Sequence, residues 1–226
     1  MTSAVSTEQR DGVLVITMDD GKVNALTLDL SSELSEALSR AEAEPAIHAA
    51  VLAGRPGRFS AGFDLSLIQS GDRAAIASMV HGGGRLVRQI YGLGVPVVGA
   101  CTGHAIAAGA LVLLGCDVRI GADIEVKVGL NEVAIGATLP GWAHAIAAAR
   151  LSRRHHQRAV LNAVLYDPRG AVDAGFLDAV VLGDDVISAA TEAAASMSNL
   201  DPAAYRSTVK AVRGATLEEM QADLER

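Results

Sequence analysis

Aromatic residues are few in this 226-residue sequence, and it contains no long apolar run. Phe, Trp and Tyr make up 3% of the residues, although 50% of all residues are hydrophobic. Ala, Val, Leu and Gly must therefore build the core, which favours helices packed closely on sheets. No apolar stretch approaches the roughly 20 residues of a membrane-spanning helix, so we expect no membrane segment. The length is sufficient for one compact domain with a full core.

An excess of basic residues is also missing. The formal net charge is −7, whereas non-specific nucleic-acid binding needs a basic surface, so we expect no nucleic-acid partner. An anionic ligand would need a locally positive pocket. The first residues have neither the basic nor the apolar region of a secretion signal, so we expect a cytoplasmic protein. Cys101 and Cys116 lie in apolar stretches at a spacing that matches no metal motif, and we interpret them as buried free thiols.

Strands and helices alternate over the first 130 residues. Apolar runs predict strands at 13–18, 49–53, 96–101, 117–122 and 125–129, and helical periodicity predicts helices at 28–43 and 74–91. After residue 130 the pattern is mostly helical and is interrupted by Pro140, Pro168 and Pro202. The alternation predicts an α/β architecture. We expect a single domain over 1–226, with an α/β core over 1–150 and a helical C-terminal part over 151–226.

Two segments of small residues are candidates for a ligand site. One runs from Phe59 to Leu65 and the other from Gly103 to Gly109, each expected to lead into a helix. Ala and Gly leave backbone N–H groups open to a ligand, and a helix N-terminus adds further free donors. Two such donors aimed at one point form an oxyanion hole. Either segment alone is typical of tight packing, and only their combination indicates a site.

Four motifs follow one another between about residues 12 and 182. They are Phe59-Ser60-Ala61-Gly62-Phe63-Asp64-Leu65, then the run from Pro96 to Ala110, then Gly115-Cys116-Asp117-Val118-Arg119-Ile120, then the run from Gly129 to Gly136. This order resembles the enoyl-CoA hydratase/isomerase (crotonase) family. The resemblance implies two near-perpendicular β-sheets surrounded by helices, and a helical C-terminal part that forms a homotrimer or a dimer of trimers. It also implies an acyl-CoA thioester substrate in fatty-acid metabolism, with coenzyme A as part of the substrate and no separate cofactor or metal.

The resemblance assigns roles to particular positions. The two oxyanion N–H groups would come from Phe63 and Ala108. The positions expected to hold coenzyme A are Ala25, Ser60, Ala61, Gly62, Asp64, Leu65 and Gly109, and Lys22 and Arg58, with Arg55, are candidates to face its phosphates. Asp64 is equally compatible with a plain helix cap.

Hydratases of the family carry glutamates at two positions, and only one of these positions has a carboxylate in this sequence. Leu111 stands at the first position and Glu132 at the second, in the run Gly129-Leu130-Asn131-Glu132. Both features resemble the Δ3,Δ2-enoyl-CoA isomerases of the family. One base can take a proton from C2 and return one to C4, so isomerisation needs no second acid. Burial among apolar residues would raise the pKa of Glu132 and make it a better base.

Three alternatives remain open from the sequence. Hydration would need an acid from elsewhere, such as His81, Asp123 or Glu125. A non-catalytic acyl-CoA-binding protein would keep the pocket without turnover. Glu132 itself is compatible with a simple helix-start acid, where the helix dipole favours a negative charge. Other residues are also ambiguous: Leu139 and Trp142 could line the acyl channel or pack in the core, and Gly82-Gly83-Gly84 could edge the acyl pocket or form a surface loop.

Overall fold

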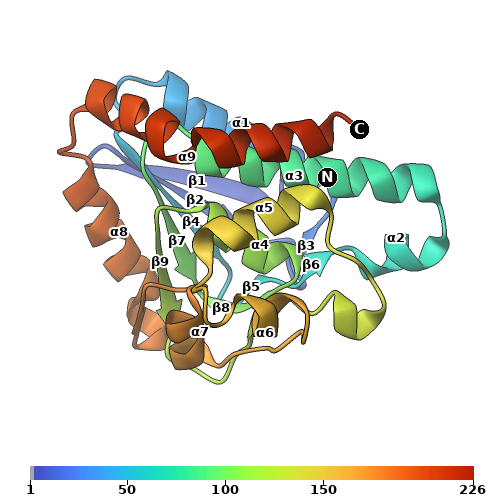
Figure 1. Cartoon of the computed structure of the whole chain (residues 1–226). Helices are drawn as coiled ribbons and strands as arrows, with labels where there is room; N and C mark the ends of the chain where they lie inside the picture. The colour runs from blue at the N-terminus through green and yellow to red at the C-terminus, as the bar shows by residue number, and fades with distance from the viewer. Residues whose placement is uncertain (1–2) are drawn as a thin grey trace.

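The computed structural model describes residues 3–226, which form three β-sheets and a set of surrounding helices (Figure 1). The strands are β1 (Val5–Arg10), β2 (Val13–Met18), β3 (Ala25–Leu26), β4 (Ala49–Gly54), β5 (Gly57–Ser60), β6 (Gly62–Phe63), β7 (Val97–Cys101), β8 (Gly103–Ile106), β9 (Val118–Ala122), β10 (Val128–Gly129) and β11 (Ala179–Val181). The helices are α1 (Leu28–Ala43), α2 (Leu65–Ser70), α3 (Arg73–Gly92), α4 (Ala108–Gly115), α5 (Gly141–Arg150), α6 (His156–Val160), α7 (Pro168–Ala174), α8 (Val186–Met197) and α9 (Pro202–Leu224), with short 3-10 turns η1 (Val133–Ile135) and η2 (Gly183–Asp185).

The largest sheet has six strands in the order β1-β2-β4-β7-β9-β11. Only the hairpin β1–β2 is antiparallel, and the other neighbours run parallel. A parallel sheet is buried on both faces, which is why the β4 run Ala-Ala-Val-Leu-Ala-Gly has no exposed residue. On one face, Ala50 and Leu52 join the main core with α1, α3, α4 and α5. On the other face, Val51 packs in a smaller core with α8.

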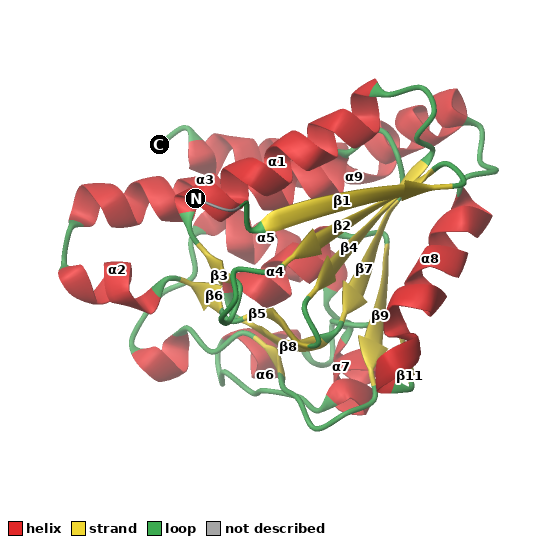
Figure 2. Ribbon diagram, turned by 180° about the vertical axis from the view of Figure 1, so that it is seen from behind, coloured by secondary structure: helices red, strands yellow, loops and turns green. Residues whose placement is uncertain are grey.

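The second sheet, in the order β10-β8-β5, begins where strands of the first sheet end. β4 ends at Gly54 and β5 begins at Gly57, while β7 ends at Cys101 and β8 begins at Gly103. Two neighbouring strands thus turn out of the first sheet at the same level, and Figure 2 shows β5 and β8 lying across it. A third, two-stranded ladder joins β3 to β6. The crotonase fold that the sequence predicts, with its helical C-terminal part, is confirmed.

Several local predictions differ from the structure. β1 was not predicted, 103–106 is a strand instead of part of a turn, and only Val128–Gly129 of the strand expected at 125–129 is present. The helix expected to follow the Phe59–Leu65 segment is present as α2. The mostly helical prediction for the last third misses β11, a short edge strand that pairs with β9. Gly82-Gly83-Gly84 is no loop: it lies inside α3 and is buried. Among the described residues, no helix combines the length and apolarity that crossing a membrane requires.

Candidate active site

Pairing between β5 and β8 brings the two small-residue segments together. Gly57 is opposite Gly103 and Ser60 is opposite Ala105, so the parallel strands end at the same edge of their sheet. Glycine lets the following turns touch. A Cβ on Gly109 would lie 2.5 Å from the carbonyl oxygen of Ser60, a distance that no real side chain tolerates. This contact explains in physical terms why the second segment has glycine at this position.

The residue before Phe63 also packs against the start of α4. Gly62, which precedes Phe63, has φ +90°, and a Cβ built on it would lie 2.9 Å from the Ala107 Cβ and 3.3 Å from the Ala108 nitrogen. Ala108 is the first residue of α4, so its N–H has no acceptor within the helix. Phe63, in β6, and Ala108, at the start of α4, therefore belong to adjoining segments, and the positive end of the α4 dipole is at this junction.

Asn24 fastens the first of these turns to the large sheet. Its buried side chain donates to the carbonyl oxygens of Met18 and Phe59, each at 3.0 Å. The main-chain carbonyl oxygen of Asn24 accepts a hydrogen bond from the Ser60 hydroxyl at 2.7 Å. That hydroxyl in turn accepts one from the Gly62 N–H at 3.2 Å. The Ser60 hydroxyl therefore stabilises the turn that precedes Phe63 through these two hydrogen bonds.

Ala107 has a backbone conformation that alanine rarely adopts. It lies at φ 52°, ψ −124°, just before α4, where a Cβ is sterically disfavoured. A non-glycine residue in such a region stores roughly 1–3 kcal/mol of strain, and strain of this kind is typical of functional turns. The turn that presents the Ala108 N–H is therefore strained in this chain.

Replacing Ala107 by Gly is expected to stabilise the protein by about 1 kcal/mol, because relief of the strain outweighs the added entropy of the unfolded chain. The melting temperature should rise by about 2–4 °C in a thermal denaturation experiment. Ala110→Gly in the interior of the same helix is the matched control, and it should lower the melting temperature. If the two variants lose stability equally, the Ala107 backbone is not strained.

Glu132 is carried to the same place by β10. Gly129 of β10 is paired with Ile106 of β8, and its carbonyl oxygen accepts the Ala107 N–H at 2.9 Å. Three residues later, Glu132 opens the 3-10 turn η1, where its carbonyl oxygen accepts the Ala137 N–H at 2.9 Å. Glu132 therefore lies three residues after β10, the strand that pairs with β8, and β8 leads into α4.

Glu132 faces a pocket of about 340 Å³. The residues that line this pocket are mostly apolar and come from α2, α3, the start of α4 and the η1 region: Ala61, Phe63, Leu65, Ile68, Ile76, Val80, Ala107, Leu111, Asn131, Glu132, Ile135, Ala137, Thr138 and Pro140. Of these described residues, Glu132 is the one with an ionisable side chain. Leu111, where hydratases carry a glutamate, is 1% exposed and apolar.

Burial raises the pKa of the Glu132 carboxyl group above its ordinary value, although backbone hydrogen bonds oppose part of the shift. Its Oε2 atom is buried and has no hydrogen-bond partner among the described residues. The predicted direction of the pKa shift is thus confirmed. A carboxylate in this state is a stronger base than one in water. The neighbouring Asn131 Oδ1 is likewise buried without a partner in the described chain, a feature that sequence reasoning missed although the residue adjoins Glu132.

The residues expected to hold coenzyme A differ in exposure, and Ser60, Gly62 and Gly109 among them are buried. Ala61 and Leu65 line the pocket, and Ala25 pairs with Gly62 in the small ladder. The Asp64 carboxylate caps α2 by accepting the Ser66 N–H at 2.8 Å, and hydrogen bonds from Ser66 lower its pKa. The helix-cap interpretation of Asp64 is therefore confirmed.

Positive charge gathers near β5 despite the acidic chain. Burial first, and then the charges of Arg58 and Lys127, lower the pKa of His104. Lys22 and Arg58 are exposed, and Arg55 lies 3.6 Å from Asp19 while donating to the Lys22 carbonyl oxygen. Lys22 and Arg58 therefore remain the exposed cations here that could face an anionic ligand, whereas Asp19 offsets Arg55.

Other candidates for catalysis lie outside the pocket. Asp123 forms an ion pair with Arg169 at 2.6 Å, and neither Glu125 nor His81 lines the Glu132 pocket. Leu139 and Trp142 do not line it either. Trp142 is fully buried and packs on Gly84 of α3. Both residues belong to the main hydrophobic core, which favours the packing alternative for them.

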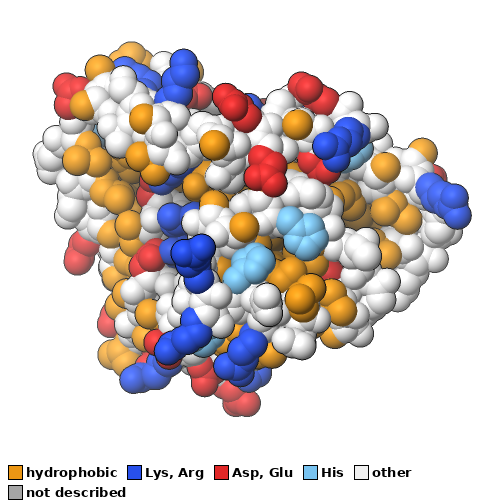
Figure 3. All heavy atoms as spheres, viewed as in Figure 1, with side chains coloured by type: hydrophobic (Ala, Val, Ile, Leu, Met, Phe, Trp, Pro, Cys, Tyr) orange, Lys and Arg blue, Asp and Glu red, His pale blue; other side chains and the backbone are white. Residues whose placement is uncertain are grey.

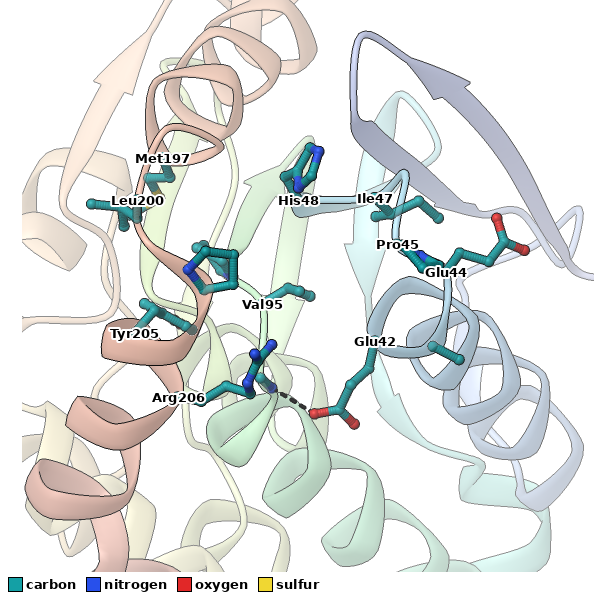
Figure 4. A pocket seen from close by; sticks show the side chains of 14 residues that line it. Glu42, Glu44, Pro45, Ile47, His48, Val95, Met197, Leu200, Tyr205 and Arg206 are labelled. Atoms are coloured by element: carbon teal, nitrogen blue, oxygen red, sulfur yellow. Dashed lines mark hydrogen bonds between the residues drawn. The ribbon is translucent and has the colours of Figure 1, made fainter.

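A second pocket, of about 320 Å³, lies between the end of α1 and the junction of α8 with α9 (Figure 4). Its labelled polar side chains include Glu42, His48 and Arg206, and the Glu42 carboxylate accepts the Gly94 N–H at 2.8 Å. It shares no lining residue with the pocket of Glu132. The two small-residue turns do not reach it, so we assign the chemistry to the first pocket.

Comparison with known proteins identifies the family to which the chain belongs. The sequence matches the enoyl-CoA hydratase/isomerase family over residues 8–225. The chain belongs to this family. It is 31% identical over 211 residues to human mitochondrial enoyl-CoA delta isomerase 1, covering 92% of this chain and 70% of that protein.

Solved structures of this family superpose closely. A probable enoyl-CoA hydratase of Mycobacterium tuberculosis matches with a TM-score of 0.95 and 37% identity, covering 99% of this chain and 94% of that one. Human mitochondrial delta3-delta2-enoyl-CoA isomerase matches with a TM-score of 0.91 and 29% identity, covering 99% and 91%. Relatives named for either reaction thus share the fold, and the reaction of this chain has to be argued from its own pocket.

Proposed function

We propose that this chain is an acyl-CoA enzyme that converts Δ3-enoyl-CoA thioesters into Δ2-enoyl-CoA thioesters. Glu132 acts as the proton shuttle, and the main-chain N–H groups of Phe63 and Ala108 bind the thioester oxygen. The observation that carries the proposal is the pocket itself. Of the described residues that line it, a single one is ionisable, and its carboxylate is desolvated beside the two adjoining turns.

The reaction has two proton transfers. Glu132 takes a proton from C2, the C3–C4 double bond shifts to C2–C3 through a dienolate, and the negative charge collects on the thioester oxygen. The two N–H groups stabilise this oxygen, and each such donor is typically worth about 3–4 kcal/mol in the transition state. Glu132 then returns the proton to C4. Because C2 and C4 lie on one face of the planar dienolate, one carboxyl group serves both steps.

Hydration is the nearest alternative in the family, and the pocket disfavours it. Adding water to a Δ2-enoyl thioester needs one group to activate the water and another to hold or protonate it. Leu111 fills the position of the first hydratase glutamate with an apolar side chain, and the Asp123, Glu125 and His81 alternatives lie outside the pocket. This argument rests on the composition of the pocket wall.

Purified protein assayed separately with 3-enoyl-CoA and 2-enoyl-CoA tests the proposal. We expect turnover of the first, followed as the appearance of the conjugated thioester, and no loss of conjugation in the second. Net hydration of 2-enoyl-CoA would contradict isomerisation and support the hydratase reading. Binding of both esters without turnover of either would support a non-catalytic acyl-CoA-binding protein.

The coenzyme A moiety is proposed to lie along the positive region near β5. Its phosphates would face Lys22 and Arg58, and its pantetheine arm would pass Ala25, Ala61 and Leu65. Arg58 and Lys127 lie close enough to His104 to contribute to lowering its pKa, after the larger effect of burial, which places two cations on this side of the site. This placement reconciles an anionic substrate with a chain whose net charge is −7.

We further propose that the protein assembles as a homotrimer through the face that carries η1 and α6. Apolar side chains are exposed there, with Ile135 at 53% and Leu161 at 61% exposure. Figure 3 shows histidine side chains among hydrophobic ones where α5 and α6 lie. A mass in solution near three times the 23.2 kDa chain is expected by light scattering, and a monomeric mass would contradict assembly.

A further inference from the structure

Three consecutive glycines interrupt the interior of α3, which is unusual because glycine costs a helix about 1 kcal/mol per residue relative to alanine. Each glycine faces a different neighbour. A Cβ on Gly82 would meet Leu28 of α1, one on Gly83 would meet the Phe63 ring, and one on Gly84 would meet Trp142. Of the three contacts, only that of Gly83 involves a residue of the active-site pocket.

The Phe63 ring packs directly on the backbone of Gly83. A Cβ at position 83 would lie 2.6 Å from Cε1 and 2.8 Å from Cζ of the ring, closer than real carbon atoms approach. Leu26 Cδ2 would lie 3.3 Å away and closes off another direction. The ring can occupy its present position only because residue 83 has no side chain.

Gly83 continues the face of α3 that lines the pocket. Ile76 and Val80 both line it, and the steps of four and three residues from 76 to 80 to 83 keep one helix face. Ile76 and Val80 form the wall with their own side chains. At the next position along this face, the helix has a gap, and the ring of Phe63, which also lines the pocket, fills it.

We propose that the pair Phe63–Gly83 determines how long an acyl chain the enzyme accepts. Gly83 lets the ring recede into α3 and leaves the apolar part of the pocket open for methylene groups beyond the reacting carbons. A side chain at position 83 pushes the ring off α3 and into that space. This inference deepens the proposed function and rests on it for the identity of the ligand, an acyl-CoA with an extended, unbranched chain.

The size of the effect follows from the transfer of methylene groups out of water. Each methylene that the pocket buries is worth about fourfold in affinity or in kcat/KM. If the displaced ring excludes two or more methylenes, long chains lose at least about tenfold relative to short ones. The main-chain N–H of Phe63 stays in the chain whatever its side chain does, so the effect should depend on acyl length.

The test is Gly83→Ala, assayed with 3-hexenoyl-CoA and 3-dodecenoyl-CoA. We expect the ratio of kcat/KM for the long ester over the short one to fall at least tenfold. Adding Phe63→Leu to this variant replaces the ring by a smaller side chain and should restore the ratio. Phe63→Leu alone, which needs no extra space, should raise the ratio above that of the wild type. An unchanged ratio in both single variants would overturn the proposal.

Gly82→Ala is the matched control, because it adds the same methyl group to the same helix but meets only the exposed side chain of Leu28. It should leave the ratio unchanged, and an equal change in Gly82→Ala would assign the effect to the helix in general. A uniform loss at both chain lengths in Gly83→Ala would also overturn the proposal, since it would indicate displacement of the oxyanion turn.

Binding of saturated hexanoyl-CoA and dodecanoyl-CoA separates this inference from the proposed reaction. These esters lack the double bond, so calorimetric titration measures the pocket without turnover. If the wild type isomerises nothing yet Gly83→Ala selectively loses dodecanoyl-CoA, the proposed reaction is wrong and the role of the pair stands. If isomerisation is observed but Gly83→Ala binds both esters as the wild type does, the reaction stands and the role of the pair is wrong.

Discussion

Glu132→Gln is expected to lower kcat for isomerisation by about 10³-fold, because the amide cannot accept the C2 proton. The remaining wall of the pocket and both N–H donors are untouched by this change. Affinity for a saturated acyl-CoA should therefore remain within a few-fold of the wild type. Steady-state kinetics with 3-enoyl-CoA and calorimetric titration with the saturated ester measure the two quantities.

The same substitution should make the protein more stable at neutral pH. Burial raises the pKa of Glu132 in the folded state, so the folded protein binds this proton more tightly than the unfolded chain does. Its ionised form therefore costs stability, and the cost grows as the pH rises from the unfolded pKa through the folded one. Glu132→Gln should raise the melting temperature above the folded pKa and have little effect at pH values below the ordinary pKa of a glutamate.

The pH dependence of the wild-type rate should show the same ionisation of Glu132. Because only the ionised carboxylate is a base, kcat/KM is expected to fall as the pH drops through a pKa above the ordinary glutamate value. Glu125→Gln is a suitable control, since Glu125 is exposed and outside the pocket. Retention of more than a tenth of the rate in Glu132→Gln, or an acid limb at the ordinary pKa, would show that another group is the base.

The parts of the site that depend on which residue type stands at a given position of a sequence motif were predictable from the sequence. The resemblance predicted that Glu132 and the two small-residue segments form one site, and β5–β8 and β8–β10 pairing brings them together. The absence of a second carboxylate followed directly from Leu111. These features are encoded in local runs, which are readable without coordinates.

Features that depend on tertiary contact were not predictable. The sequence could not decide between a pocket edge and a surface loop for Gly82-Gly83-Gly84, because the contact of Gly83 is with a ring that lies 20 residues earlier in the sequence. The strain at Ala107 is a backbone property that alanine, an ordinary helix former, gives no reason to expect. Leu139 and Trp142 stayed undecided because apolar residues near a site fit a core and a channel equally well from sequence alone. The short edge strand β11 was missed for a similar reason, since three residues carry too little periodicity.

A buried ionic cluster fastens α9 to the core of the fold. The side chains of Asp117 and Arg213 form an ion pair and are only 8% and 12% exposed. Asp117 also accepts the Tyr205 hydroxyl at 2.9 Å and the Val97 N–H at 2.8 Å. The Arg213 guanidinium lies 4.7 Å from the centre of the Tyr91 ring and donates to the carbonyl oxygen of Tyr91 at 2.9 Å. The cluster thus joins α9 to α3 and to the two strands β7 and β9.

Arg213→Met should be the most destabilising of the changes considered for this chain. It keeps a side chain of similar length but leaves the Asp117 carboxylate buried without its cation, which typically costs about 3–5 kcal/mol. At about 2–4 °C per kcal/mol, the melting temperature should fall by roughly 10 °C.

Two further variants separate loss of the buried pair from loss of any arginine. Arg10→Met removes an ion pair with Glu8 whose partners are 67% and 61% exposed, and it should shift the melting temperature by less than about 2 °C. Adding Asp117→Asn to Arg213→Met removes the unpaired charge, while the amide oxygen can take the place of Oδ2 and accept the Val97 N–H and the amide NH2 can donate to the Tyr205 hydroxyl. The double variant should therefore melt above Arg213→Met, because the cost lies in the uncompensated carboxylate and not in the missing cation. A double variant that melts lower still would contradict this, and would place the cost in hydrogen bonds that the Asp117 carboxylate makes and the amide cannot reproduce.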